Sequence, residues 1–469
     1  MQRWIPILFL AAAGSLAAQG TDTLGADFKL EGKAYGDDCA FAIKNPKANP
    51  DGSPGGTVQS CAQELFTGNP LHLTAGSLAP QNGVGFGPAF AFDPDLTNWR
   101  LNINSDAVVS TNGSWRAGLY IKAAKTPTKP STVVVLTQRP THPLKPTPPA
   151  PAPELNFYAQ GISLHQLGYY GIGNATSRSA EALYQMREVV IGANGLLPFG
   201  NSGFGLFAEA NGRSVDIRPD TGNAIPAIGQ FYTNLSAPGL AYQPVFAQLG
   251  QGARFDRTFA NRLTLDYSAT IQEFVAGSSS FNRLTLDFAH TIIFDRTETH
   301  AASPTPPHAS GPDGGADVSK PNYHTKDHEG SVNFGVTVVQ SFVPTGNAVP
   351  FYFQPTLGGT DINGNSSLPS YPDYRFRAPN LLLFHASIEH SIWGPFGAEF
   401  LSQAGMVAQN RGDLAVAHLH HSFAAGLTIH AGGFPEVAIL FAWGGHEGTH
   451  TTAYISPGLL GGSGRPSLF

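Results

Sequence analysis

The chain has 469 residues, of which 13% are charged and 11% aromatic, with 54 glycines, 37 prolines and a net charge of -6. So small a charged share, with a mean hydropathy of -0.10 that is too low for a helical membrane protein, favours many strands joined by turns. The negative balance leaves no basic surface, which excludes nucleic acid as an expected partner.

Residues 1–18 have the pattern of a secretory signal peptide. Arg3 supplies the positive start, an apolar run covers residues 4–13, and small residues follow up to Ala18, near which we expect cleavage. This run is too short for a membrane anchor, and no later stretch approaches the ~18 apolar residues that a spanning helix needs. An exported chain of this kind enters a membrane as a closed barrel, since open strand edges cannot be left unpaired in lipid. We therefore expect a protein of the bacterial outer membrane, surrounded by its lipid.

The segments on either side of the predicted strands show no folded-domain signature. Residues 19–80 are expected to form an irregular leader in the periplasm or the lumen, and residues 461–469 a C-terminal tail. The leader holds both cysteines, Cys39 and Cys61. In an oxidising periplasm a disulfide between them fits this pair better than a metal site does.

Residues 81–460 are dominated by segments in which apolar and polar residues alternate. In residues 261–271 (NRLTLDYSATI) every second residue from Leu263 to Ile271 is apolar, and residues 282–292 (NRLTLDFAHTI) repeat nearly the same text. Period two places the two sets on opposite faces of a sheet, as lipid outside and water inside a barrel require. The sixteen predicted strands cover residues 84–92, 98–109, 114–124, 155–167, 183–197, 203–215, 242–256, 261–275, 281–297, 329–343, 349–361, 380–393, 397–409, 419–432, 434–446 and 449–458.

A soluble β-sandwich or propeller would also alternate. However, one face carries Trp, Phe, Leu and Ile on strand after strand, and several strands exceed the usual five or six residues. Both features favour an all-β fold with a transmembrane antiparallel barrel of about sixteen strands.

Two proline-rich segments interrupt the predicted strands. Residues 125–154 and residues 298–328 have the composition of extended or irregular chain. Both follow odd-numbered strands of the prediction, which places them on one side of the barrel, the outer one in ordinary topology.

The motifs of known chemistry are weak. Residues 446–450 (HEGTH) match the zinc-protease pattern, but their neighbours are strand and turn formers, and residues four apart in a strand lie ~13 Å apart. The histidines at 418, 420 and 421 fit a wet hairpin end better than a metal site. No catalytic motif is convincing, so we expect neither an enzyme nor a cofactor.

Charged residues on the predicted inner face could form a catalytic or selectivity group, or a polar lining cross-paired to rigidify the wall. The second interpretation is favoured for a watery lumen. These residues are Arg100, Asp106, Arg116, Asp266, Asp287, Glu389 and Glu399.

The C-terminal third carries a more specific pattern. From Leu357 it reads LGGTDINGNSSLPSYPDYRFRAPNLLLFHASIEHSIWGPFGAEFLSQAGMVAQ. A glycine pair ends a strand, a loop with a Tyr-rich Arg-Phe-Arg segment follows, and NLLL opens the next strand. This order resembles the barrel of the BamA/TamA outer-membrane assembly-factor superfamily, also called bacterial surface antigens. Residues 155–174 and 184–195 resemble an earlier part of the same barrels.

The chain departs from that family in the loop. Family members carry Arg-Gly-Phe/Tyr at a loop tip folded into the lumen, and the arginine pairs with an aspartate on strand thirteen. Here the matching text is LPSY, ending at Tyr371, and the matching wall position is Gln403. The absence of both the arginine and the aspartate is physically consistent, because either charge buried without its partner would be costly. The candidate site residues are therefore the loop group Tyr371, Arg375, Phe376 and Arg377, and the wall group Glu389, Glu399 and Gln403.

The resemblance implies a barrel whose first and last strands meet at a weak seam, used in full members to insert or secrete other outer-membrane proteins. Full members also carry periplasmic POTRA domains, which we do not expect in residues 21–80 because this segment is too short and too glycine-rich. The leading hypothesis is an assembly-factor-like barrel of reduced form. The alternatives are a passive diffusion channel and, least supported, a surface scaffold or adhesin displaying the proline-rich loops. A channel needs residues 361–379 to lie aside, whereas an assembly-type barrel needs them folded inward.

Overall fold

The computed structural model describes residues 70–455, apart from 95, 97, 126–151, 221–223, 261, 296–329, 394–395 and 432–433, together with Lys29 and Lys33. The expected signal peptide, Cys39, Cys61 and the tail at 461–469 lie outside the described residues, as does most of both proline-rich segments.

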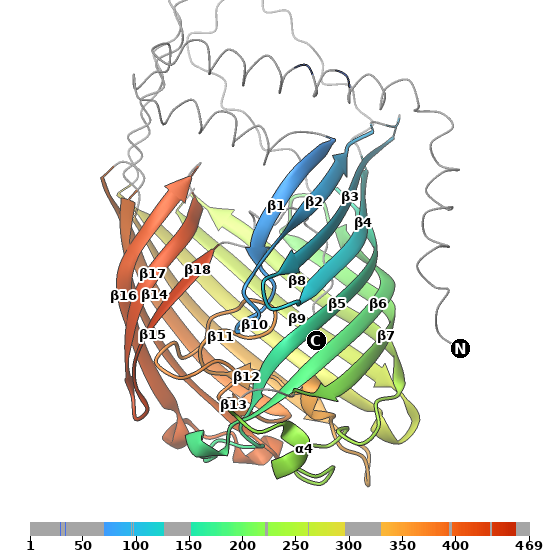
Figure 1. Ribbon diagram of the computed structural model, residues 1–469. Helices are drawn as coiled ribbons and strands as arrows, with labels where there is room; N and C mark the ends of the chain where they lie inside the picture. Colours follow the sequence, from blue (N-terminus) through green and yellow to red (C-terminus); the bar gives the residue numbers. More distant parts are fainter. Residues whose placement is uncertain are drawn as a thin grey trace, which may run out of the picture.

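The described chain forms one antiparallel sheet of sixteen strands, in which each strand pairs with the next along the chain. Figure 1 shows this sheet curled into the wall of a barrel. The all-β architecture, the antiparallel pairing and the number of strands are confirmed. Among the described residues, no helix has the length and hydropathy needed to cross a bilayer.

The sheet contains β1 (Leu71–Ser77), β2 (Val84–Phe92), β3 (Trp99–Ser110), β4 (Trp115–Lys125), β5 (Glu154–Tyr169), β6 (Ala182–Pro198), β7 (Phe204–Pro219), β8 (Val245–Phe259), β9 (Leu263–Val275), β10 (Phe281–Phe294), β11 (Gly330–Phe342), β14 (Asn380–Trp393), β15 (Phe396–Ala408), β16 (His420–Ala431), β17 (Phe434–Gly445) and β18 (Gly448–Ile455). A separate pair is formed by β12 (Thr356–Leu357) and β13 (Phe376–Arg377). The helical turns are η2 (Arg178–Ala180), α4 (Ile228–Phe231), η3 (Gly277–Ser279), η4 (Phe351–Phe353), η5 (Arg411–Asp413) and η6 (Val416–His418).

Two of the predicted assignments are wrong, and they cancel in the count. Strand β1 lies within the leader that was expected to be irregular, where Leu71, Leu73 and Ala75 do alternate with polar residues. Conversely, residues 349–361 do not join the wall. They hold three consecutive buried aromatics in η4, and such a run cannot divide between two faces of a sheet.

This shift reverses the expected placement of the proline-rich segments. They follow β4 and β10, the fourth and tenth strands, whereas residues 343–379 follow β11, the eleventh. In an up-and-down sheet, even and odd strands end at opposite ends of the barrel. We call the end where β11 stops the loop end, at the bottom of Figure 1, and the opposite one the far end. The strands that precede the two proline-rich segments thus end on the same side, as predicted, but they are even-numbered strands and not odd-numbered ones.

The two faces of the wall differ in the way that alternation predicts. On β6, Val189 and Ile191 are 51% and 50% exposed, while Glu188 is 1% exposed and pairs with Arg213 at 3.0 Å. A second buried pair joins Arg116 to Asp106 at 2.8 Å. Ion pairs thus crosslink the lumen wall, and apolar side chains cover the outer face.

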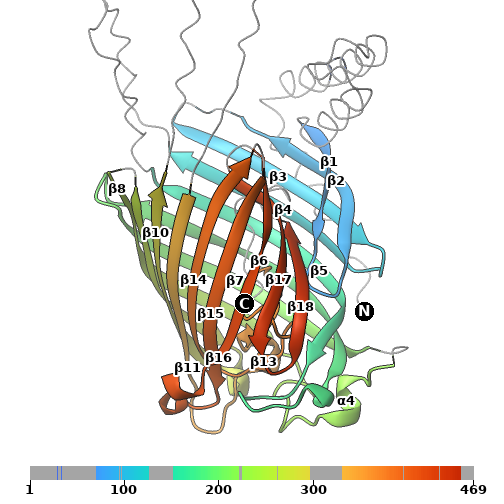
Figure 2. The same ribbon diagram turned by 90° about the vertical axis from the view of Figure 1, so that its left-hand side faces the viewer.

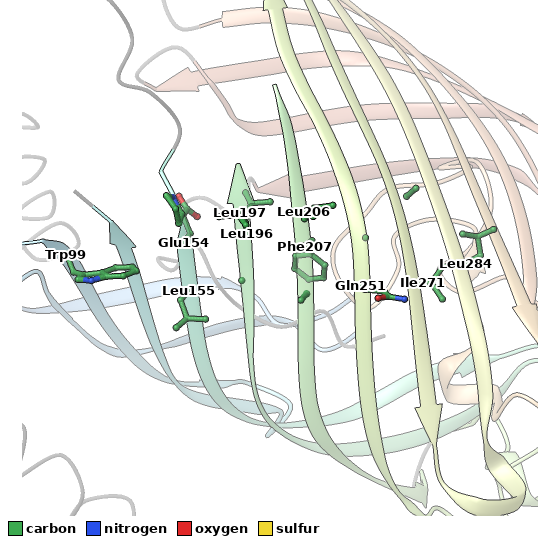
Figure 3. A pocket seen from close by; sticks show the side chains of 15 residues that line it. Trp99, Glu154, Leu155, Leu196, Leu197, Leu206, Phe207, Gln251, Ile271 and Leu284 are labelled. Atoms are coloured by element: carbon green, nitrogen blue, oxygen red, sulfur yellow. The ribbon is translucent and has the colours of Figure 1, made fainter. Parts of the chain in front are cut away.

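A groove of about 780 Å³ runs along the surface of the wall, across the strands from β3 to β10 (Figure 3). Its lining includes Leu155, Leu197, Leu206 and Ile271, which are 38–51% exposed. Small residues such as Gly252 separate these side chains. An apolar surface with such depressions suits contact with lipid acyl chains.

The sheet is not closed. Every internal strand has two hydrogen-bonded neighbours, but no ladder between described residues joins β1 to β18. Figures 1 and 2 show these two edge strands on the same side of the barrel. We call this open junction the seam.

Candidate functional site

Residues 343–379, which we call the lumen loop, fold into the barrel at its loop end. The aromatic side chains of η4 pack against the inner wall. Phe351 lies edge-on to Tyr169 and Tyr184, with ring centroids 5.1 Å apart in both pairs, and Phe353 lies 4.9 Å from Phe246. All five rings are almost fully buried. The lumen loop therefore forms a packed hydrophobic core inside the loop end of the barrel.

A tight turn at Gly358 and Gly359 starts the tip of the lumen loop. Their φ angles are +107° and +56°, a region of backbone conformation that residues other than glycine rarely adopt. A Cβ on Gly358 would lie 2.5 Å from the carbonyl oxygen of Pro372, so the two arms of the loop could not approach. The glycine pair is thus required by the shape of the loop.

Two acidic side chains hold the tip together. Asp373 accepts a hydrogen bond from the Thr360 N–H at 2.9 Å, and Asp361 accepts from the N–H groups of Asn363 and Asn365 at 2.9 and 2.8 Å. Burial raises the pKa of both carboxyls above their ordinary value. These acids stabilise the folded shape of the loop through its own backbone.

The tip contacts the wall through neutral hydrogen bonds. The Leu368 N–H donates to Gln403 Oε1 at 2.5 Å, and Gln403 Nε2 donates to the Ser366 carbonyl at 3.2 Å. Beside them, the Ser370 N–H donates to Ser422 Oγ at 2.9 Å. Gln403 thus lies on the wall beside the loop tip, and it binds the loop backbone through its amide.

The charged contact of the lumen loop lies elsewhere, at Arg375. Its guanidinium donates to Glu447 at 2.6–2.9 Å and to the hydroxyl and carbonyl oxygens of Thr176 at 2.8 and 2.5 Å. The side chains of Arg375 and Glu447 are 2% and 16% exposed. The Phe376 ring lies 4.6 Å from the guanidinium carbon. This arginine therefore joins the lumen loop to the β5–β6 connection and to the β17–β18 turn.

Glu447 is the site residue that the sequence reasoning missed. It belongs to the HEGTH segment, whose backbone is a hairpin turn and the start of β18. Its backbone carbonyl also accepts from Arg178 at 2.9 Å. The only hint in the sequence was the presence of Glu447 within the HEGTH motif. That motif does not have the backbone geometry of a zinc site, and nothing in it indicates a contact with Arg375.

The remaining loop residues pack around the same point. Arg377 donates to the Phe351 carbonyl at 2.6 Å, while its own carbonyl accepts from the Gly173 N–H at 2.8 Å. The Phe376 ring stacks on His420 at 4.0 Å. Tyr371 packs edge-on to Phe376 at 5.1 Å. The four loop residues singled out from the sequence are therefore brought together at the loop end.

Glu389 and Glu399 are not part of this cluster. They lie opposite each other in the β14–β15 register, and Thr428 donates to Glu389 at 2.8 Å. Both positions lie toward the far end of their strands, whereas the lumen loop enters β14 at Asn380. Of the predicted wall group, only Gln403 contacts the loop among the described hydrogen bonds.

No family model and no curated protein sequence matches the chain. Among solved structures it is similar to BamA from Haemophilus ducreyi lacking POTRA domains 1–3, with 10% identity and a TM-score of 0.44 over 82% of this chain and 70% of that chain. It is also similar to CdiB from Acinetobacter baumannii and from Escherichia coli. Both are 10% identical over 82% of this chain, with TM-scores of 0.43 and 0.44 over 58% and 62% of theirs. The chain thus spans less than two thirds of either CdiB chain.

Proposed function

We propose that the protein is an integral outer-membrane β-barrel of the assembly-factor type, acting on other outer-membrane proteins without catalysing a reaction. The seam carries this proposal. Strand edges without a partner are costly in lipid, so a gap between β1 and β18 favours pairing with a strand from outside. Every other described strand of the sixteen-stranded sheet already has two hydrogen-bonded neighbours.

The packed lumen loop supports the same proposal over a passive diffusion channel. A channel needs a continuous water-filled path, but the aromatic core around Phe351 and Phe353 occupies the loop end. Toward the far end, Arg254 and Asp266 are about half exposed. The lumen is thus polar at one end and packed at the other.

The proposal is tested by the folding of a client. The purified protein is reconstituted in liposomes, and the folding rate of a small unfolded outer-membrane β-barrel protein is compared with that in empty liposomes. A photo-crosslinking residue at Thr451, on the edge strand β18, should capture the client. The same residue at Val189, on the closed part of the wall, serves as the control. An unchanged folding rate together with equal capture at both positions would contradict the proposal.

A further inference from the structure

Two arginines lie together on the outer face of the barrel, at its loop end. Arg187 lies near the start of β6 and Arg218 near the end of β7, two neighbouring strands of the wall (Figure 1). In the register Arg187 is opposite Asp216, two positions before Arg218, so the two arginines are diagonal neighbours. Such neighbours lie ~7–8 Å apart, and two long side chains can therefore reach one group between them. We call Arg187, Asp216 and Arg218 the arginine cluster.

Both arginines belong to the face of the wall that carries the exposed apolar side chains. On β6, alternation places Arg187 on the same face as Val189 and Ile191, which are 51% and 50% exposed. On β7, Arg218 shares its face with Leu206, which is 50% exposed. In both strands the arginine lies on the loop-end side of the apolar residues. The arginine cluster therefore lies where the apolar band of the outer face ends.

A tryptophan in the same row indicates the level of the membrane surface. Across β4, β5 and β6, Trp115 is opposite Ser163, and Ser163 is opposite Arg187. Trp115 is 39% exposed, whereas the next residue, Arg116, is buried on the lumen side. Aromatic residues form girdles around membrane barrels at the depth of the lipid headgroups. The two guanidinium groups are thus at the depth where lipid phosphates lie.

The protein leaves part of this positive charge uncompensated. Asp216 pairs with Arg218 at 2.7 Å, and the side chains of this pair are 49% and 45% exposed. Arg187 is exposed, and its side chain forms no ion pair or hydrogen bond with another described residue, although Asp216 is directly opposite. Two guanidinium groups share one carboxylate, so one positive charge remains accessible from the lipid side.

This charge is local and does not belong to a continuous belt. Within the described strands, no other arginine or lysine lies on the outer face toward the loop end. Arg116, Arg213 and Arg283 lie toward the same end, but they face the lumen and are at most 5% exposed. A single concentrated charge favours one bound anionic group over a diffuse attraction to the whole membrane surface.

From this arrangement we infer that the arginine cluster binds the phosphate group of a membrane lipid. The planar guanidinium group donates two parallel hydrogen bonds to phosphate oxygens, which makes arginine well suited to this contact. The apolar residues of β6 and β7 continue from the cluster along the wall and contact the acyl chains of the same lipid. The inference rests on the membrane location of the barrel, but it does not rest on the proposed action on other proteins.

The test is native mass spectrometry of the refolded full chain in an uncharged detergent, titrated with lipids. The probes are dioleoylphosphatidylglycerol, lipid A and dioleoylglycerol, which has the acyl chains of the first probe but no phosphate. We expect at least one phosphate-bearing lipid to bind more tightly than dioleoylglycerol. Equal binding of all three would overturn the inference. Displacement of the lipid by an equal concentration of inorganic phosphate would assign the site to free phosphate, and it would also overturn the inference.

Substitutions locate the bound lipid at the arginine cluster. We expect Arg187→Gln to weaken binding about fivefold and Arg187→Gln with Arg218→Gln about thirtyfold, the effects of one and two cations near a membrane surface. Asp216→Asn removes the only carboxylate of the cluster and should tighten binding.

The matched control is Arg254→Gln. Arg254 is also 45% exposed and paired with an aspartate, but it faces the lumen and cannot reach a lipid. Unchanged binding in the double variant, or an equal loss in Arg254→Gln, would overturn the inference. Because no client protein is present, these results are independent of the folding assay for the proposed function.

Discussion

Arg375 and Glu447 form a bidentate ion pair at 2.6–2.9 Å, with the arginine almost wholly buried and the two partners 72 positions apart in the chain. It joins the lumen loop to the last hairpin of the sheet, whose outer strand β18 borders the seam. The sequence lacks both partners of the loop-tip ion pair carried by the family that it resembles, and the charged contact of the lumen loop lies at the edge of the sheet.

Removing one member of this pair should destabilise the barrel. We expect Arg375→Met or Glu447→Gln to lower the free energy of unfolding by ~3 kcal/mol, because the remaining group stays buried without its partner. The double variant should lose less than the sum of the two single variants. Urea unfolding in lipid vesicles, followed by circular dichroism, measures these differences. Arg218→Ala breaks the exposed pair with Asp216 and should change stability by no more than ~1 kcal/mol. Additive effects of the two single variants would show that the pair contributes no coupling.

The lumen loop should restrict ion flow. In planar bilayers we expect the wild type to give small, erratic currents, because the aromatic core fills the loop end. Deleting residues 368–377 removes Arg375 and Arg377, which bind the loop to Glu447 and to the Phe351 carbonyl, and should therefore release the core and produce larger and steadier steps. Gln403→Leu, which removes the hydrogen bonds to the tip and the contact with His385, should give intermittent openings of intermediate size. Large ohmic steps from the wild type would instead favour the diffusion channel.

Asp373 should make the stability of the loop depend on pH. Burial raises the pKa of its carboxyl above the ordinary value of 3.8, so the folded loop binds a proton more readily than the unfolded chain does. The contribution of this proton to the free energy of unfolding is complete at pH values below 3.8, and it is lost as pH rises through the raised pKa. Asp373→Asn keeps an oxygen for the Thr360 N–H but cannot ionise. We expect this variant to be more stable than the wild type at neutral pH.

The advantage of Asp373→Asn should disappear as pH falls below the ordinary value. Urea unfolding midpoints of both proteins across the acidic range provide the measurement. Asp413→Asn, at the exposed turn η5, is the control for a general charge effect. A difference between Asp373→Asn and the wild type that stays constant with pH would show that Asp373 does not titrate with the loop.

Gly358→Ala should dislodge the lumen loop. The substitution combines a positive φ with a Cβ only 2.5 Å from a backbone oxygen, and such strain costs ~1–3 kcal/mol or more. Trypsin cleavage after Arg375 and Arg377, read by mass spectrometry, should become faster in this variant, since both are 2% exposed in the docked loop. Gly229→Ala, where an added Cβ meets nothing within 4 Å, should be cleaved like the wild type.

The strands were predictable because their signal is local. Alternation from Leu263 to Ile271 follows from the pleat of a single strand and requires no knowledge of the rest of the chain. The same rule misplaced residues 349–361, where Phe351–Phe353 are buried from all sides by other elements. Because β1 was missed and residues 349–361 were counted as a strand, the strands that precede the proline-rich segments were numbered odd in the prediction and are even in the structure.

The site was predictable only in part, for a related reason. The family resemblance gave the lumen loop and Gln403. The partners of Arg375 lie 72 and 199 residues away along the chain. No spacing in the sequence indicates that Glu447 or Thr176 contacts Arg375. The lumen loop, the β5–β6 connection and the β17–β18 turn meet only once the sheet is assembled.

That separation bears on the order in which the molecule forms. Contacts across 199 residues close only after the entropy of a long chain segment has been lost, so they belong to the last events of folding. The docking of Arg375 would then lie after the rate-limiting barrier. Its loss should accelerate unfolding and leave the folding rate almost unchanged. The docked lumen loop thus slows unfolding, and it docks only after the strands of the wall have paired.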